Sequence, residues 1–175
     1  DVTAMTQSGN LYMYGLGNPN YYVDQAGEEG VAVILLYNAF TGDGTTKDYS
    51  SDPLFLTTFS SSPTLRKEVE KRLKEFKKTG EYQKTITGSI GFYGNDINSI
   101  DRDLHLGVGK ANYVISFVRI KKDVYDVTVT ISDTYDFDEY RDSVSLSNML
   151  NNWGYDRQKK GDITPFYWRL TFKMK

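Results

Sequence analysis

The residues whose types and spacing are best suited to chemistry form one acidic and aromatic segment, residues 133–141. It holds four carboxylates, three aromatic rings and one arginine: Asp133, Tyr135, Asp136, Phe137, Asp138, Glu139, Tyr140 and Arg141. In an extended chain Asp136 and Asp138 share one face, and the aromatic residues beside them take the other. Carboxylates this close repel one another and suit a divalent cation or a general base. The alternative is an exposed loop whose aromatic residues cover the core, because most carboxylates are simply solvated.

His105 is the single histidine of the chain and the second candidate for chemistry. Its ordinary pKa lies near neutrality, so it can serve as one general acid or base. One histidine cannot form a histidine-rich metal site, and the absence of cysteine excludes thiolate zinc sites and cysteine nucleophiles. The following Gly-Val-Gly-Lys, residues 107–110, is too short for a phosphate-binding loop. We expect His105 on a strand, where it could also be an ordinary polar strand residue.

A β-hairpin is expected to position the acidic segment. Residues 113–120 and 125–131 alternate apolar and polar side chains and are rich in Val, Ile and Tyr, with turn residues 121–124 between them. This alternation predicts two paired antiparallel strands with one buried face. The second strand runs directly into residue 133, so Asp133 and Tyr135 should share a face while Asp136 enters the following turn.

Residues 63–78 give the clearest helical pattern. Ser62 is a natural N-cap, Pro63 suits the first helical position, and Gly80 ends the pattern. Apolar residues at helical spacing form one stripe, and the opposite side is rich in Lys and Arg. Such a basic side could contact anionic lipid or nucleic acid, although a basic side interspersed with Glu is more often only solvated.

The remaining segments complete an α+β fold. The prediction is a curved, mostly antiparallel sheet, at most half-closed into a barrel, with two helices. Its parts are a strand or a helix over 31–37, strands over 54–59 and 82–93, a bend or bulge at Gly88 or Gly91, a polar loop over 95–102, a helix from Ser145 that ends at Gly154, a basic loop with Arg157, Lys159 and Lys160, and a central strand over 166–174.

Composition limits the possible classes of protein. The 175 residues fit one domain, or one domain with a short appendage, and a net charge of −2 gives no basic footprint for general nucleic-acid binding. The longest apolar run, residues 31–37, is too short to span a bilayer. The first residue is Asp rather than Met and no secretory signal follows it, so we expect a fragment or a processed product.

The first 27 residues resemble the closing segment of the RHS (YD-repeat) core. That family typically shows an Asn-x-Tyr-x-Tyr, an Asn-Pro, and a Tyr-x-Asp-Pro-x-Gly. The matching residues here are Asn10, Tyr12, Tyr14, Asn18-Pro19 and Tyr22-Val23-Asp24-Gln25-Ala26-Gly27, with Gln25 in place of the usual proline. In RHS proteins this segment joins a β-shell to an exchangeable C-terminal toxin, and self-cleavage often occurs near it. The resemblance implies a junction segment over 1–27 and a toxin domain over 28–175.

The acidic segment carries a second resemblance. Asp133-Thr134-Tyr135-Asp136 resembles the Asp-x-Tyr-Asp signature of colicin M-type bacteriocins. Those enzymes have a half-open β-barrel with helices and cleave lipid II between lipid and pyrophosphate in the periplasm, with a divalent cation. Their His-Arg pair follows five residues after the second Asp, whereas Tyr140-Arg141 follows here after three.

Together the two resemblances imply a hydrolytic antibacterial toxin and roles for five residues. Asp133 and Asp136 would hold Mg²⁺ or another divalent cation, or supply the base. Arg141 would bind phosphate, Tyr135 would orient the substrate, and His105 would replace the missing histidine as general acid. The toxin would be secreted or delivered into a target bacterium and act in its periplasm or envelope. The implied partners are an upstream RHS shell, a cognate immunity protein and a lipid-linked cell-wall precursor.

Two other classes of function remain open. One is an intracellular ribonuclease-type toxin that uses His105 with Lys110 or Arg141. The other is a non-enzymatic module that binds a receptor or a membrane, although the short apolar segments argue against insertion. The compartment in which the chain is toxic distinguishes the first of these from a lipid II hydrolase.

Overall fold

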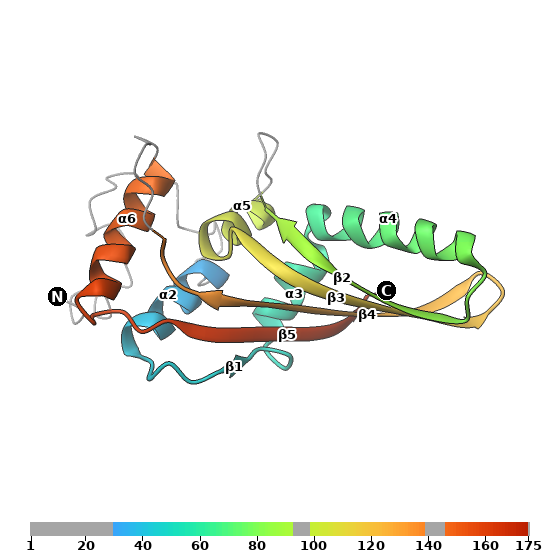
Figure 1. The fold of residues 1–175 in the computed structure, drawn as a ribbon, viewed down its shortest axis with the longest axis horizontal. Coiled ribbons are helices and arrows are strands. Elements are labelled where there is room, and N and C mark those ends of the chain that lie inside the picture. Colours follow the sequence, from blue (N-terminus) through green and yellow to red (C-terminus); the bar gives the residue numbers. More distant parts are fainter. Residues whose placement is uncertain (1–29, 93–98, 139–145, 175) are drawn as a thin grey trace.

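A five-stranded open sheet forms the centre of the molecule. The computed structural model describes residues 30–92, 99–138 and 146–174. Its strands are β1 (Lys47–Asp48), β2 (Gln83–Gly91), β3 (Lys110–Lys121), β4 (Val124–Tyr135) and β5 (Phe166–Met174), in the order β1-β5-β4-β3-β2 (Figure 1). β1 pairs with β5 in parallel and every other pair is antiparallel. The predicted hairpin and curved α+β sheet are confirmed, and the last strand lies between two neighbours, as predicted.

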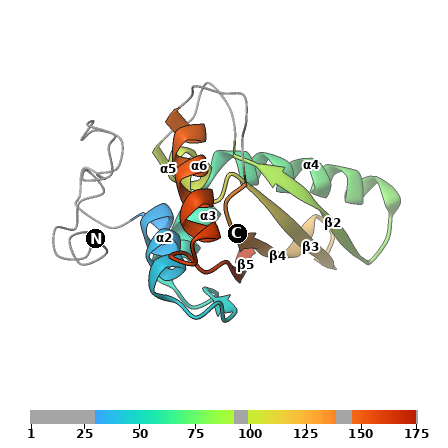
Figure 2. The ribbon, with the colours of Figure 1, turned by 60° about the vertical axis from the view of Figure 1, so that its left-hand side comes forward.

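Five helices are described, where two were predicted. They are α2 (Val31–Thr41), α3 (Pro53–Ser61), α4 (Pro63–Thr79), α5 (Ser99–Gly107) and α6 (Leu146–Lys159). α4 confirms the predicted helix, because the Ser62 hydroxyl accepts a hydrogen bond from the Leu65 amide at 3.2 Å and Gly80 ends it with φ of 72°. α4 runs lengthwise beside β2, whereas α2, α5 and α6 gather at the opposite end of the sheet (Figure 1, Figure 2).

Three segments differ from their predicted structures. The strand predicted over 54–59 is helix α3, which begins because Asp52 accepts hydrogen bonds from the Leu54 and Phe55 amides, with Pro53 at its first turn. The polar loop predicted over 95–102 and the strand predicted for His105 give way to α5, while residues 93–98 lie outside the described part. The ambiguous segment 31–37 is helical, in α2.

The helices cover one face of the sheet. Trp168 of β5 and Phe117 of β3 point toward this face, where Phe59 of α3 lies 5.8 Å from Trp168 and Phe76 of α4 lies 5.4 Å from Phe117, between ring centroids. Burying each such ring contributes about 1.5–3 kcal/mol. The opposite face has no helix over it in the described part and carries hydroxyl side chains, including Thr130 and Thr171, whose oxygens lie 2.9 Å apart.

Two aspartates of α5 fasten two other helices. The buried Asp101 accepts hydrogen bonds from the hydroxyls of Ser62 at 2.5 Å and Thr64 at 2.7 Å, at the start of α4. Asp103 accepts from the Val31 and Ala32 amides at 2.8 and 3.1 Å, at the start of α2. A carboxylate at a helix N-terminus satisfies free amides and complements the helix dipole. α5 is therefore held between α2 and α4.

Gly88 lies in a regular ladder, so the bend or bulge predicted at Gly88 or Gly91 is wrong. β2 pairs with β3 without interruption, with Gly88 opposite Tyr113 and Gly91 opposite Lys110. A Cβ at Gly88 would lie 2.5 Å from the Tyr113 hydroxyl oxygen. Glycine is needed there because the Tyr113 ring crosses directly over the backbone.

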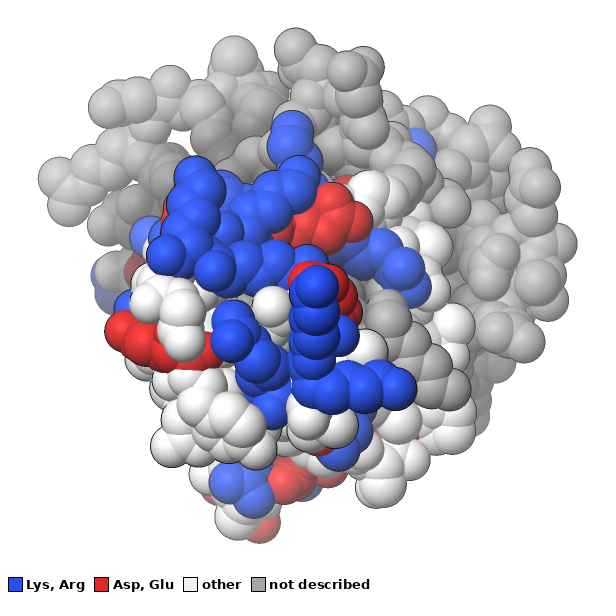
Figure 3. Space-filling model, turned by 90° about the vertical axis from the view of Figure 1, so that its right-hand side faces the viewer, with Lys and Arg blue, Asp and Glu red and all other residues white. Residues whose placement is uncertain are grey.

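The two ends of the long axis differ in charge. Lys and Arg gather over the end formed by α4 and the β3–β4 turn (Figure 3). The opposite end, where β4 finishes, carries the described part of the acidic segment, residues 133–138. Among the described residues no helix is long and apolar enough to cross a membrane.

Candidate functional site

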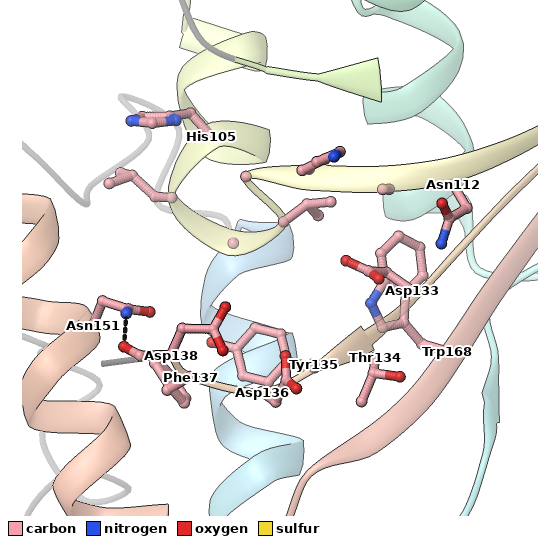
Figure 4. A pocket seen from close by; sticks show the side chains of 16 residues that line it. His105, Asn112, Asp133, Thr134, Tyr135, Asp136, Phe137, Asp138, Asn151 and Trp168 are labelled. Carbon is pink, nitrogen blue, oxygen red and sulfur yellow. Dashed lines mark hydrogen bonds between the residues drawn. The ribbon is translucent and has the colours of Figure 1, made fainter. Parts of the chain in front are cut away.

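A pocket of about 530 Å³ lies where β4 ends, between α5, the start of β3 and α6 (Figure 4). Polar groups from four elements line it. They include His105 of α5, Lys110 and Asn112 of β3, Asp133, Thr134 and Tyr135 of β4, Asp136 and Asp138 just beyond it, and Asn151 of α6. Trp168 of β5 forms part of its apolar wall.

Strand register directs Asp133 and Tyr135 to the helix-covered face. Ile131 on the same strand is fully buried, and side chains two residues apart share a face, so Asp133 and Tyr135 follow it toward the helices. Asp133 is paired with Trp168, and the Tyr135 ring lies 5.6 Å from Phe166. β4 stops at Tyr135, and Asp136 leaves the sheet. The prediction that Asp133 and Tyr135 share a face is confirmed.

The segment after β4 is fastened to α6. The Phe137 amide donates a hydrogen bond to the Gln158 side-chain oxygen at 3.1 Å, and the Asn151 side chain donates to the Asp138 carbonyl. The Phe137 ring lies against Gly154, where a methyl group would overlap it. These contacts fix the direction in which Asp136 and Asp138 leave the strand.

α6 corrects the prediction for residues 145–160. The helix does not end at Gly154 but continues to Lys159. Gly154 is explained instead by packing, because the Phe137 ring occupies the space that a side chain at this position would take. Arg157 and Lys159 therefore lie in its last turn rather than in a basic loop, and Lys160 follows in the turn. The predicted cap Ser145 lies outside the described residues.

Burial and mutual repulsion disfavour the charged carboxylates. Burial raises the pKa of Asp133, and the negative charge of Asp136 raises it further, against the opposing effect of Lys110. Burial also raises the pKa of Asp136, with a further rise from Asp138. Burial raises the pKa of the Tyr135 hydroxyl as well, so it stays protonated. Raised carboxyl pKa values in a pocket are typical of acid–base sites and of sites that gain from a bound cation.

His105 lines the same pocket from another wall. It lies on α5, and its ring points away from Asp133 (Figure 4). Burial lowers its pKa, so the imidazole is neutral near neutral pH. A neutral histidine fits a hydrogen-bonding or base role better than the predicted role of general acid.

The structure brings together most of the predicted site. Asp133, Tyr135, Asp136 and His105 line one pocket, and Arg141 lies outside the described residues. The pocket also contains Lys110, which the sequence analysis named only for the ribonuclease alternative, and three residues to which it gave no role in a site: Asn112, Asn151 and Trp168. Only strand pairing could have placed Trp168 beside Asp133, because 35 positions separate them in the chain.

The described carboxylates fit a shared metal ion rather than a complete metal site. Within the described ranges no group of three or more His, Asp or Glu side chains is arranged to hold a metal ion. Asp133 and Asp136 nonetheless form an interacting pair whose repulsion a cation would relieve. Mg²⁺ is commonly held by one or two carboxylates together with substrate phosphates. Asp133 and Asp136 are therefore at most part of a metal site, because the described residues supply no third protein ligand.

Comparison with known proteins gives a structural likeness and no match in sequence. No protein-family model matches the chain, and no curated protein matches it in sequence. Among solved structures the chain is similar to PaeM, a colicin M-like bacteriocin produced by Pseudomonas aeruginosa, with a TM-score of 0.39 and 14% sequence identity over 94% of this chain and 57% of that chain. The chain thus spans little more than half of that structure. A TM-score of this size does not establish a shared fold, and none of the comparisons bears on the RHS-like segment.

Proposed function

We propose that the pocket is the active site of an antibacterial toxin that hydrolyses a phosphate ester or pyrophosphate in a lipid-linked cell-envelope precursor, as colicin M-type enzymes do with lipid II. One observation carries the proposal. Asp133, Tyr135 and Asp136 of the Asp-x-Tyr-Asp motif lie together in one pocket, and burial and repulsion raise the pKa values of both carboxyl groups.

The pocket offers the groups that hydrolysis at phosphorus needs. Water attacks phosphorus and the bond to the leaving oxygen breaks, so the reaction needs a base for the water proton and positive charge near the phosphoryl oxygens. Asp133 is the base in this proposal, and Lys110 supplies a cation on the same pocket wall. In the alternative arrangement, Asp133 and Asp136 would together hold a divalent cation, which would neutralise charge on the phosphate, and Asp133 would then be a ligand rather than the base.

Tyr135 and Trp168 define the apolar side of the site. The Tyr135 ring is fixed by Phe137 at 5.4 Å and Phe166 at 5.6 Å, which suits a group that orients substrate. Arg141 stays a proposed phosphate contact, since it follows the described segment in the chain. Among the described residues that line the pocket, Lys110 is the one that carries a positive charge.

A ribonuclease-type toxin is the second candidate. His105 and Lys110 both line the pocket, and they are one of the two pairs that a ribonuclease would use, the other being His105 with Arg141. Three carboxylates, Asp133, Asp136 and Asp138, line the same pocket and would repel a polyanionic backbone. The acidic lining therefore favours a substrate with a single phosphate or pyrophosphate group.

Expression in two compartments tests the proposal. The chain should inhibit bacterial growth when a signal sequence exports it to the periplasm, and it should not do so in the cytoplasm. Asp133→Asn should abolish the inhibition, and Asp156→Asn, an exposed aspartate of α6 outside the pocket, should retain it. Toxicity confined to the cytoplasm would overturn the proposal in favour of an intracellular target.

The proposal includes the partners that the sequence implies. Residues 1–27 would join the toxin to an RHS shell, and a cell that makes the toxin would need a cognate immunity protein. Co-expression of the neighbouring open reading frame should restore growth of cells that export the toxin. Failure of that rescue would count against an immunity protein encoded beside the toxin.

A further inference from the structure

A second charged region lies away from the pocket and has no part in the proposed reaction. It consists of α4, residues 81–84 and the turn residues 119–124, and we call it the basic edge (Figure 3). It contains eleven of the 21 Lys and Arg residues of the chain but five of its 23 Asp and Glu residues. The chain as a whole carries a net charge of −2, so positive charge is concentrated on this edge.

Most of the acidic residues on this edge are already paired. Glu68 and Glu75 accept hydrogen bonds from the Arg72 guanidinium at 2.8 and 3.1 Å. Glu81 lies 3.2 Å from the Lys84 ammonium. By contrast, Lys121 and Lys122 of the turn form no ion pair within the described residues. Among the described residues Lys67, Lys74, Lys77 and Lys78 of α4 also form no ion pair, so free positive charge extends along α4 to the tip of the β3–β4 hairpin.

Exposed apolar side chains surround these lysines. Ile120 is 59% exposed, Val124 is 41% exposed, and Tyr82, just before β2, is 64% exposed. The Arg119 amide donates a hydrogen bond to the Tyr82 carbonyl at 2.9 Å, so the three apolar side chains lie around one turn. They make up half of the large apolar residues that the described part leaves exposed.

Lysines beside exposed aliphatic and aromatic side chains on a projecting turn are typical of a surface that binds at a lipid interface. Each Lys or Arg near an anionic bilayer adds attraction, and the apolar side chains enter the boundary between headgroups and acyl chains. Nucleic acid would use the same charges but gains little from exposed aliphatic groups. The apolar residues therefore favour lipid over nucleic acid.

We propose that the basic edge binds the surface of an anionic lipid bilayer. α4 carries lysines along its length, at 67, 71, 74, 77 and 78, from the hairpin tip back to its N-terminus, which Asp101 of α5 holds. Contact along this edge would lay the molecule lengthwise on the membrane. α5, which lines the pocket, would then lie at the other end of the same edge (Figure 1). This binding does not depend on the proposed reaction.

Vesicle binding tests the proposal on the full 175-residue chain. The protein should sediment with vesicles of equal parts phosphatidylglycerol and phosphatidylcholine, and not with phosphatidylcholine alone. The double variant Lys121→Gln/Lys122→Gln should bind on the order of tenfold more weakly. Lys159→Gln/Lys160→Gln makes the same change of charge at the end of α6 and in the turn after it, and should bind like the unmodified chain. Equal loss in both double variants would show attraction by net charge alone and would overturn the proposal.

A variant that loses an exposed apolar side chain distinguishes binding to lipid from binding to nucleic acid. Ile120→Ser removes an exposed aliphatic side chain and leaves the charge unchanged, so it should weaken vesicle binding several-fold. A fluorescein-labelled single-stranded RNA serves as the competing probe. Binding of this RNA that depends on Lys121 and Lys122, without binding to vesicles, would overturn the proposal. Circular dichroism establishes that each variant is folded. Failure of the unmodified chain to bind the anionic vesicles would also contradict the proposal.

Discussion

The pocket and the basic edge place charge in opposite ways. At the pocket, burial raises the pKa values of Asp133 and Asp136, so that the fold disfavours their charged forms. At the basic edge, Lys121 and Lys122 are exposed, where charge is well solvated at little cost. The fold therefore opposes the charged form of these carboxyl groups at the pocket, whereas it leaves the charges of the basic edge in contact with solvent. A disfavoured charge indicates a reaction or a bound ion, and exposed charge indicates a surface contact.

The largest expected effect is on catalysis. Asp133→Asn should reduce hydrolysis at least a hundredfold, since general-base catalysis contributes about 10²- to 10⁴-fold. Because the folded pKa of Asp133 is raised, its charge opposes folding at neutral pH, and this penalty is absent below its unfolded pKa. The melting temperature of Asp133→Asn should therefore be equal or higher by about 1–3 °C at pH 7.

If vesicle binding by Asp133→Asn is unchanged, the pocket and the basic edge act independently of each other. Asp156→Asn is the control, with the same loss of charge at an exposed position outside the pocket. A fall in melting temperature in proportion to lost activity would show that Asp133 has a structural role instead.

The contact between Phe137 and Gly154 should have the next largest effect. Alanine has the higher helix propensity by about 1 kcal/mol, but a methyl group here would overlap the Phe137 ring, which costs about 1–3 kcal/mol. Gly154→Ala should thus lower the free energy of unfolding and also displace Asp136, with reduced activity. Chemical denaturation measures the first effect. In Phe137→Ala/Gly154→Ala the cost of the added methyl group should disappear, and an equal cost in both backgrounds would contradict the account.

A smaller, pH-dependent effect is expected beneath the basic edge. The Tyr113 hydroxyl donates to Glu68 at 2.8 Å and accepts from the Arg72 guanidinium at 3.1 Å. Burial raises the pKa of Glu68, but the hydrogen bonds that its carboxylate accepts from Tyr113 and Arg72, with the positive charges of Arg72 and Lys71, outweigh burial and hold the pKa below its usual value. The resulting stability is present above the unfolded pKa, about 4.3, and is lost as pH falls through the folded pKa.

Tyr113→Phe should cost about 1 kcal/mol at pH 7. The difference from the unmodified chain should shrink as the pH falls below about 4.3. Thermal unfolding across this range measures it. A difference that stays constant with pH would show that Glu68 does not titrate through this contact.

The smallest effect is expected at His105. Its ring points away from Asp133 and its pKa is lowered, so His105→Ala should reduce activity by only a few-fold at neutral pH. Rate measurements between pH 5 and pH 8 test this role. A loss as large as that of Asp133→Asn would restore His105 to the centre of the mechanism.

Sequence periodicity predicted the parts of the fold that repeat regularly. The hairpin, α4 and β5 each show several residues at a constant spacing. α3 was wrongly predicted as a strand because its short apolar run holds β-branched Thr57 and Thr58, and its start signal, Asp52 before Pro53, was overlooked. α5 was not predicted, because its aspartates accept hydrogen bonds at the starts of α2 and α4, and these helices are distant from α5 in sequence.

The site was predictable only where it lies on one strand. Asp133, Tyr135 and Asp136 follow from the alternation of β4 and its end at residue 135. The pairing of Trp168 with Asp133, and the approach of Asn151 to Asp138, depend on tertiary contacts that leave no local signal. Gly154 was interpreted as a helix end because the ring that requires it is 17 positions away.

The most direct test of the central claim is hydrolysis of lipid II by the purified chain in the presence of Mg²⁺. The account predicts that the unmodified chain cleaves lipid II between lipid and pyrophosphate. It predicts that Asp133→Asn releases the soluble product at least a hundredfold more slowly. Removal of Mg²⁺ by a chelator should reduce the rate of the unmodified chain. No cleavage by the folded, unmodified chain, or equal cleavage by Asp133→Asn, would contradict the account.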